Sequence, residues 1–246
     1  MKEGKTPQML LQLSNLEVSY HKKQVIFGLS LTVEAGMVAA LVGPNGAGKT
    51  TTLNTVIGLL HPRKGEVFFR GENITRQKAS ENVRRGISLI PQGGRVFPDL
   101  SVLENLELGG YLLEPGRLQE RLSYVCGLFP ILGERQKQRA DSLSGGERQM
   151  LAIAMALIRQ PSVMLFDEPT ANLSPKISAE VINEIVKLKD DLGKTILLVE
   201  QNAVNALKCG QKALLLVSGR IAFDGESSDL LSSPELGQLY LGLKSQ

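Results

Sequence analysis

One segment of eight residues constrains the fold of this chain more than any other: Gly43-Pro44-Asn45-Gly46-Ala47-Gly48-Lys49-Thr50. A glycine, four further residues, a second glycine, a lysine and then serine or threonine form the pattern of a phosphate-binding loop. The glycines let the backbone curl tightly, so that successive N–H groups point at one anion. Lys49 adds a positive charge for the β- and γ-phosphates, and the Thr50 hydroxyl can bind Mg²⁺. The segment therefore predicts a nucleotide site, which we extend to the next residue, Thr51.

The residues on both sides of this loop argue against the alternative, a glycine-rich turn that matches the pattern by chance. Residues 38–42 are all apolar, as expected of a buried parallel strand. Residues 49–60 are predicted to form a helix whose N-terminus faces the phosphates. A strand, a phosphate loop and a helix in this order favour an α/β fold with the loop at the end of the strand.

The composition fits one large domain, which we expect to span residues 1–246. Hydrophobic residues make up 42% of the chain, enough for a packed core. We expect no membrane span and no signal peptide, because no apolar run is long enough and residues 1–11 lack the signal pattern. If the protein acts at a membrane, another chain must supply the spans. A net charge of +3 without a long basic block argues against nucleic acid as the main partner.

The expected elements follow the order of an α/β protein that carries an insertion. Two partly alternating runs between residues 10 and 33 predict antiparallel strands, preceded by a loose leader at residues 1–9. Further strands are expected at 66–70, 87–90, 163–166, 195–199, 213–217 and 220–223, and further helices at 147–158, 178–192, 202–209 and 230–243. Leucines at helical spacing from 101 to 129 predict a helical subdomain, which we place at about residues 93–157. The pattern predicts a mostly parallel sheet covered on both faces, with an antiparallel β subdomain and a helical insertion subdomain.

A second candidate feature follows the apolar run 163–166, which is predicted to deliver Asp167 to the carboxyl edge of the sheet, where active sites of open α/β sheets lie. A carboxylate there can hold Mg²⁺, and the adjacent Glu168 can polarise an attacking water. The alternative is a strand that simply ends in an acidic turn. The combination of Asp167 and Glu168 with the phosphate loop favours a site for nucleotide hydrolysis.

The third feature is Leu143-Ser144-Gly145-Gly146-Glu147-Arg148-Gln149, which resembles the signature motif of the ATP-binding-cassette family. Ser144, Gly145, Gly146 and Glu147 open a predicted helix, whose exposed N–H groups and dipole can bind a phosphate. The resemblance implies a RecA-like P-loop NTPase fold. It also implies that this phosphate belongs to ATP bound on another subunit, so that two cassettes pair head to tail around two nucleotides.

The resemblance extends to other positions of this chain. Tyr20 matches the aromatic residue that stacks on adenine, although it can also be a strand-end core tyrosine. Gln92 matches the glutamine that senses Mg²⁺ and the attacking water, and the glycines after it suit a hinge. Residues 171–174 match the dimer-contacting loop, with Ser174 in place of the usual aspartate.

Gln201 departs from the family pattern, because many cassettes carry a switch histidine at this position. An amide can donate a hydrogen bond to the γ-phosphate but cannot carry charge or titrate near neutral pH. We expect hydrolysis to be retained, since Lys49, Gln92 and Glu168 supply the other catalytic groups. It is expected to be slower, or to be concentrated in one of two paired sites.

The run Glu-Gln-Asn at 200–202 resembles the LivF-like subgroup, the ATP-binding subunits of branched-chain amino-acid uptake systems and related urea or amide importers. Residues 94–106 and 240–242 resemble the same subgroup. The implied protein is an ATPase that uses ATP and Mg²⁺ to drive a membrane transporter from the cytoplasmic face of the cell membrane. Its implied partners are transmembrane permease subunits, a second cassette that is either identical or related and, indirectly, a substrate-binding protein. The alternatives are a soluble mechanochemical ATPase of the same family and an export or lipid-extraction cassette.

Overall fold

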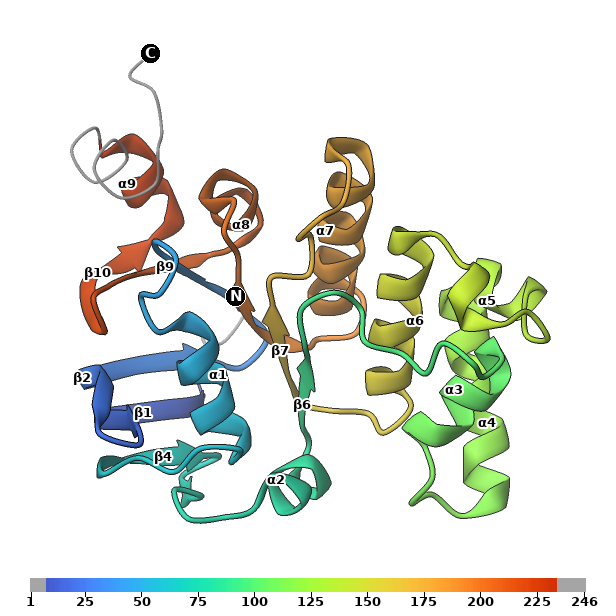
Figure 1. The fold of residues 1–246 in the computed structure, drawn as a ribbon, viewed down its shortest axis with the longest axis horizontal. Coiled ribbons are helices and arrows are strands. Elements are labelled where there is room, and N and C mark those ends of the chain that lie inside the picture. Colours follow the sequence, from blue (N-terminus) through green and yellow to red (C-terminus); the bar gives the residue numbers. More distant parts are fainter. Residues whose placement is uncertain (1–7, 234–246) are drawn as a thin grey trace, which may run out of the picture.

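The computed structural model describes residues 8–233 and contains two sheets (Figure 1). The larger has six strands in the order β10 (Arg220–Glu226), β9 (Lys212–Val217), β3 (Val38–Val42), β8 (Thr195–Val199), β7 (Val163–Asp167) and β6 (Ile87–Ile90). Strands β9, β3, β8, β7 and β6 are parallel, and β10 is an antiparallel edge strand. The smaller sheet is antiparallel, with the order β2 (Lys23–Glu34), β1 (Met9–Tyr20), β4 (Lys64–Phe69) and β5 (Glu72–Asn73).

The helices of the described residues fall into two groups in Figure 1. Those that lie against the sheets are α1 (Lys49–Ile57), α2 (Ala79–Arg85), α7 (Pro175–Asp190), α8 (Ala203–Cys209) and α9 (Ser227–Ser232). Those that form the lobe on the right of the view are α3 (Val102–Gly109), α4 (Pro115–Leu128), α5 (Pro130–Glu134) and α6 (Gly145–Leu157), with the short 3₁₀ helix Ala140–Ser142; α6 also packs against the six-stranded sheet. None of the helices in the described part is long and apolar enough to cross a lipid bilayer.

Both faces of the six-stranded sheet are buried, which explains why its parallel strands are apolar throughout. Successive side chains of a strand point to opposite faces. In β3, Val38 and Ala40 pack toward helices α6, α7 and α8, whereas Ala39 and Leu41 pack toward α1 and the antiparallel sheet. The result is a layered core in which the antiparallel sheet and α1 cover one face and the long helices cover the other. This is the predicted fold class.

Several element bounds differ from those predicted. The first helix ends at Ile57 and not at residue 60, because Gly58 adopts a left-handed conformation with φ 91° and caps the helix. Helix α2 was missed because its seven residues include few apolar side chains, so they carry no helical periodicity. Met9 belongs to β1 and not to a leader; residues 1–7 of the expected leader, and residues 234–243 of the expected last helix, lie outside the described residues.

Within the helical lobe, Arg121 joins α4 to the C-terminus of α6, and its cationic side chain is buried. Its Nε and Nη2 atoms donate to the carbonyl oxygens of Ile158 and Leu157, both at 3.2 Å. These carbonyls belong to the end of α6, where backbone acceptors lack helical partners and a cation is favourable. The guanidinium also stacks over the Tyr124 ring at 4.3 Å.

Arg121→Met should destabilise the fold by about 1–3 kcal/mol, because it leaves buried carbonyl groups without their charged donor. Chemical denaturation followed by circular dichroism measures the change. Arg117→Met is the matched control, since Arg117 lies one turn earlier on the same helix and its exposed side chain donates to the side chain of Gln160. Equal stability of the Arg121 and Arg117 variants would contradict the capping role.

Candidate active site

Four parallel strands place the predicted catalytic residues at one edge of the sheet. The phosphate loop follows β3, Gln92 follows β6, Asp167 ends β7, and Gln201 follows β8. Because the carboxyl ends of parallel strands meet at the same edge, residues far apart in sequence come together there.

The phosphate loop is closely packed at two of its three glycines, Gly43 and Gly48. A Cβ atom on Gly43 would lie 2.1 Å from the carbonyl oxygen of Leu216, and one on Gly48 would lie 2.5 Å from the Ile26 side chain. Lys49 is only 5% exposed, and its Nζ donates to the carbonyl oxygens of Gly43 at 2.9 Å and Pro44 at 3.2 Å. The loop therefore curls around its own lysine and holds the amine at the N-terminus of α1.

Thr50 and Asp167, both predicted to bind Mg²⁺, are in direct contact. The Thr50 hydroxyl donates to Asp167 Oδ1 at 3.0 Å. Burial raises the pKa of the Asp167 carboxyl, while the hydrogen bond from Thr50 and the charge of Lys49 oppose that rise. A hydroxyl and a carboxylate are hard oxygen donors, the class that Mg²⁺ prefers when it also binds substrate phosphates. The donor set fits the predicted metal.

Glu168 is held by contacts to three sides of the site. Gln92 Nε2 donates to Glu168 Oε2 at 3.0 Å, and Lys49 Nζ lies 3.8 Å from Glu168 Oε1. The backbone N–H of Glu168 donates to the carbonyl oxygen of Val199 at 2.9 Å. The glutamate thus links the phosphate loop, the Gln92 loop and strand β8.

These groups open into a cavity of about 730 Å³. Of the predicted site residues, the ones that line it are Tyr20, Asn45, Gly46, Gly48, Lys49, Thr50, Thr51, Gln92, Glu168 and Gln201. The sequence analysis missed five lining residues: Lys23, Gln24, Val25, Phe27 and Ser218. Four of them follow Tyr20 in the β1–β2 hairpin, so their nearness to Tyr20 was the available signal. Ser218 lies in the turn between β9 and β10 and carried no signal.

The signature residues do not join this cavity. Ser144 caps α6: its Oγ accepts from Glu147 N at 3.3 Å, and Glu147 Oε2 accepts from Ser144 N at 2.8 Å. Hydrogen bonding from the Ser144 backbone lowers the pKa of Glu147, and Arg135 lies 3.0 Å from its carboxylate. Ser144, Gly146 and Glu147 instead line a separate groove of about 840 Å³ against α7. The start of α6 therefore lies outside the cavity lined by the phosphate loop.

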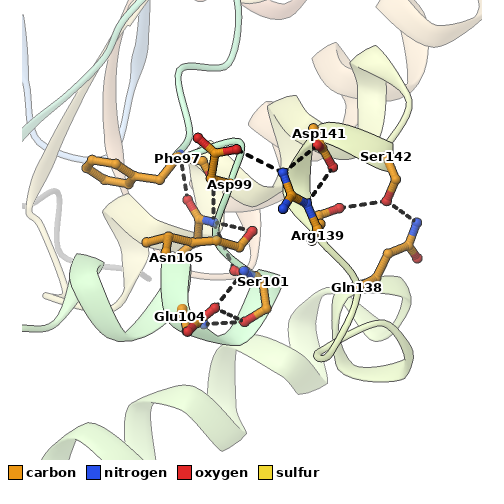
Figure 2. Close-up of polar contacts among 10 residues, drawn as sticks. Phe97, Asp99, Ser101, Glu104, Asn105, Gln138, Arg139, Asp141 and Ser142 are labelled. Atoms are coloured by element: carbon orange, nitrogen blue, oxygen red, sulfur yellow. Dashed lines mark hydrogen bonds and ion pairs between the residues drawn. The ribbon is translucent and has the colours of Figure 1, made fainter.

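A polar network fixes the segment that precedes the signature (Figure 2). Arg139 Nη2 lies 2.8 Å from Asp99 Oδ1 and 2.8 Å from Asp141 Oδ2, which joins two segments forty residues apart. Asn105 of α3 holds the loop around Phe97. Its Nδ2 donates to the carbonyl oxygens of Phe97 and Ser101, and its Oδ1 accepts from Phe97 N at 2.7 Å. The loop after Gln92 is thereby tied to the start of the signature.

The loop at residues 171–174 ends at Ser174, whose Oγ accepts from Ile177 N at 3.5 Å and caps α7. Serine and aspartate are both favoured at this helix position. The departure from the usual aspartate therefore keeps the capping function.

The match of residues 26–171 to the family model described as ABC transporter decides the family, because it covers more than half of the chain. The chain belongs to the ABC transporter family. As a member, it is an ATP-hydrolysing subunit that energises membrane transport. The cassette is 40% identical over 234 residues to a protein of Archaeoglobus fulgidus named "Probable branched-chain amino acid transport ATP-binding protein LivF", covering 95% of this chain and 99% of that protein. It is 39% identical to the high-affinity branched-chain amino acid transport ATP-binding protein BraG of Pseudomonas aeruginosa, covering 95% and 100%.

Solved structures support the same fold. An ATP-binding cassette of an ABC transporter in its ADP conformation superposes with a TM-score of 0.83 at 25% identity, covering 94% of this chain and 97% of that one. A dimeric cassette in a post-hydrolysis state bound to ADP and phosphate superposes with a TM-score of 0.77 at 25% identity, covering 89% and 99%.

Gly43→Ala should weaken ATP binding by roughly tenfold or more, a loss of about 1.4 kcal/mol or more, because the added methyl forces the loop away from Leu216. Titration of the purified chain with a fluorescent ATP analogue measures the affinity. Gly116→Ala in α4 is the control, since a Cβ there meets no atom within 4 Å. Unchanged affinity of the Gly43 variant would show that the close packing of the loop is dispensable.

Proposed function

We propose that this cassette is the ATP-hydrolysing subunit of an importer for branched-chain or other amino acids. The observation that carries the proposal is the identity of 39–40% to the two amino-acid transport proteins, which extends over 95% of the chain. The contacts among Lys49, Thr50, Asp167 and Glu168 support retained hydrolysis.

Each polar group at the sheet edge takes a role in phosphoryl transfer. The N–H groups of the loop from Gly43 to Thr51 and the amine of Lys49 bind the phosphates. Thr50, Gln92 and Asp167 would hold Mg²⁺, which would supply positive charge to neutralise the phosphates. Glu168 orients the attacking water, and Gln92 keeps the glutamate side chain in place through its 3.0 Å hydrogen bond.

Tyr20 and Gln201 both line the cavity and take different proposed roles in it. Tyr20 is 42% exposed at the end of β1, so its ring is free to stack on adenine. Gln201 follows β8 beside Glu168, within reach of the γ-phosphate end. Its amide donates a hydrogen bond but cannot titrate, so it supports slower turnover than an imidazole would.

The position of the signature supports a head-to-tail pair of cassettes. Ser144, Gly145, Gly146 and Glu147 lie outside the cavity of their own chain, and their N–H groups at the start of α6 suit a phosphate held by a second cassette. A related chain or an identical copy can fill this role. The subgroup resemblance favours a related one.

The helical lobe supplies the surface for the permease. Tyr111 is 70% exposed just after α3, and Leu108, Leu112 and Phe97 are exposed nearby in the sequence. The network of Figure 2 connects the loop that carries Phe97 to the segment before the signature. Closing and opening of the cassette pair would therefore move this surface against the transmembrane subunits on the cytoplasmic side of the membrane. A substrate-binding protein would act through the permease.

Glu168→Gln should retain ATP affinity and hydrolyse ATP at only a small fraction of the wild-type rate, because the amide cannot orient and polarise water as a carboxylate does. Phosphate release by the purified complex and nucleotide titration of the chain give the two quantities. The variant is also expected to accumulate as an ATP-bound pair. Turnover at the wild-type rate would remove Glu168 from its proposed role.

Affinity capture of the chain from its native membranes should recover polytopic membrane proteins and a second cassette, identified by mass spectrometry. Tyr111→Glu should lose them, because it places a charge on the proposed apolar contact surface. Leu59→Glu is the control, since Leu59 is 60% exposed and follows α1, outside the helical lobe. Recovery of ribosomes or of enzymes that act on nucleic acids would favour the mechanochemical alternative. Recovery of the membrane subunits of a lipid exporter would favour the export alternative.

A further inference from the structure

The backbone conformation of Glu168, at the start of the turn that follows β7, is unusual. Glu168 lies in the left-handed region with φ 45°, which is uncommon for a residue with a side chain. Such a conformation persists where surrounding contacts determine it, and it is found at functional sites. One contact is the hydrogen bond from the Glu168 N–H to Val199, which fixes only the start of the turn.

The second contact comes from Glu200, a carboxylate that the sequence analysis did not assign to the site. Its side chain is 2% exposed, and its Oε1 accepts from the backbone N–H of Thr170 at 3.0 Å. The turn continues with a bond from Ala171 N to the Glu168 carbonyl oxygen at 3.1 Å. Glu168 is therefore restrained on both sides, through its own N–H and through the residue two positions later.

Glu200 and its neighbour Gln201 connect two parts of the site. Gln201 is exposed and lines the nucleotide cavity, whereas Glu200 is buried beneath the turn. A hollow of about 680 Å³ on this side of the molecule is lined by Glu168, Thr170, Glu200 and Gln201 together. Any shift of the end of β8 that moves Gln201 also moves the acceptor that holds Thr170.

Burying a carboxylate costs more desolvation free energy than burying a neutral acceptor, so accepting from one N–H group alone does not account for Glu200. Burial raises the pKa of the Glu200 carboxyl, while hydrogen bonds from Thr170 oppose that rise. A neutral acceptor would satisfy the same N–H with less loss of solvation. What the long side chain adds is reach, because its oxygen spans from the end of β8 to the turn that follows β7.

We propose that Glu200 is a positioning residue, whose side-chain oxygen holds the turn at Thr170 and thereby directs the Glu168 side chain toward the attacking water. This inference rests on the proposed role of Glu168 in hydrolysis. Misplacement of a catalytic group lowers turnover without removing the contacts that bind ATP.

The test compares three substitutions of Glu200 in the transporter complex. Glu200→Met has a similar volume but no oxygen acceptor, and Glu200→Gln keeps an acceptor oxygen at the same reach. Glu200→Asp keeps the charge but withdraws the acceptor by one methylene group. We expect kcat to fall at least about tenfold in the Met and Asp variants and to stay within about threefold of wild type in the Gln variant. KM for ATP, and the affinity of the full chain for a fluorescent ATP analogue, should stay unchanged in all three.

Two controls separate the possible failures. Asn82→Ala removes a buried side chain that donates to the Ile57 carbonyl oxygen at 3.1 Å, outside the catalytic contacts, so it should lower the melting temperature but not kcat. Glu168→Gln shows whether the glutamate is catalytic at all. Wild-type turnover in Glu168→Gln would overturn both the proposed function of Glu168 and this inference. A defective Glu168→Gln beside wild-type turnover in Glu200→Met and Glu200→Asp, or equal losses in all three Glu200 variants, would overturn the inference alone.

Discussion

The convergence of parallel strand ends at one edge is the constraint on which the rest of the structure depends. Strand β8 is hydrogen-bonded to β3 on one side and to β7 on the other. The three strands therefore end at similar levels, at Val42, Val199 and Asp167. The polar residues after them must then meet, whatever their distance in sequence. Thr50 and Asp167 lie 117 positions apart and form a 3.0 Å hydrogen bond. The site is a consequence of strand register, and the loops add the side chains.

The six-stranded sheet is buried on both faces, and different elements cover the two faces. Helices α6, α7 and α8 cover one face, and α1 with the antiparallel sheet covers the other. Tyr20 reaches the cavity because the covering hairpin β1–β2 ends beside the phosphate loop. The signature belongs to α6, on the opposite face, so the same layering that completes one side of the nucleotide site keeps Ser144 out of it. This separation is the basis for the proposed pairing of two cassettes.

Much of the fold was predictable because the buried strands are short apolar runs with clear ends. The bounds of β3, β6 and β8 agree with the prediction at both ends. Helix α2 was not predictable, since its stability comes from caps and from Asn82, which donates to the end of α1, and not from an apolar stripe.

For the site, the motifs indicated Lys49, Thr50, Asp167 and Glu168, which lie together at one edge of the sheet, but they could not identify the residues that contact them. Ser218 reaches the cavity through a turn between two strands, and the Glu200 side chain accepts a hydrogen bond from the backbone N–H group of Thr170. Both depend on tertiary contacts that leave no spacing pattern in the sequence.

The charges at the sheet edge show how this site accommodates a polyanion while carrying carboxylates. Asp167, Glu168 and Glu200 are each bound by groups that do not have to leave when phosphate enters: Thr50, Gln92 and Thr170. Lys49 directs two N–H bonds to loop carbonyl oxygens, and an ammonium group has three such donors. One donor is therefore available for a phosphate oxygen while the loop keeps its shape. Glu168 lies 3.8 Å from the same amine, so in the proposed mechanism the lysine on one side and the turn at Thr170 on the other position the glutamate relative to the phosphates. On the proposed roles of Glu168 and Glu200, the restraints on that turn therefore contribute to hydrolysis alongside the carboxylate itself.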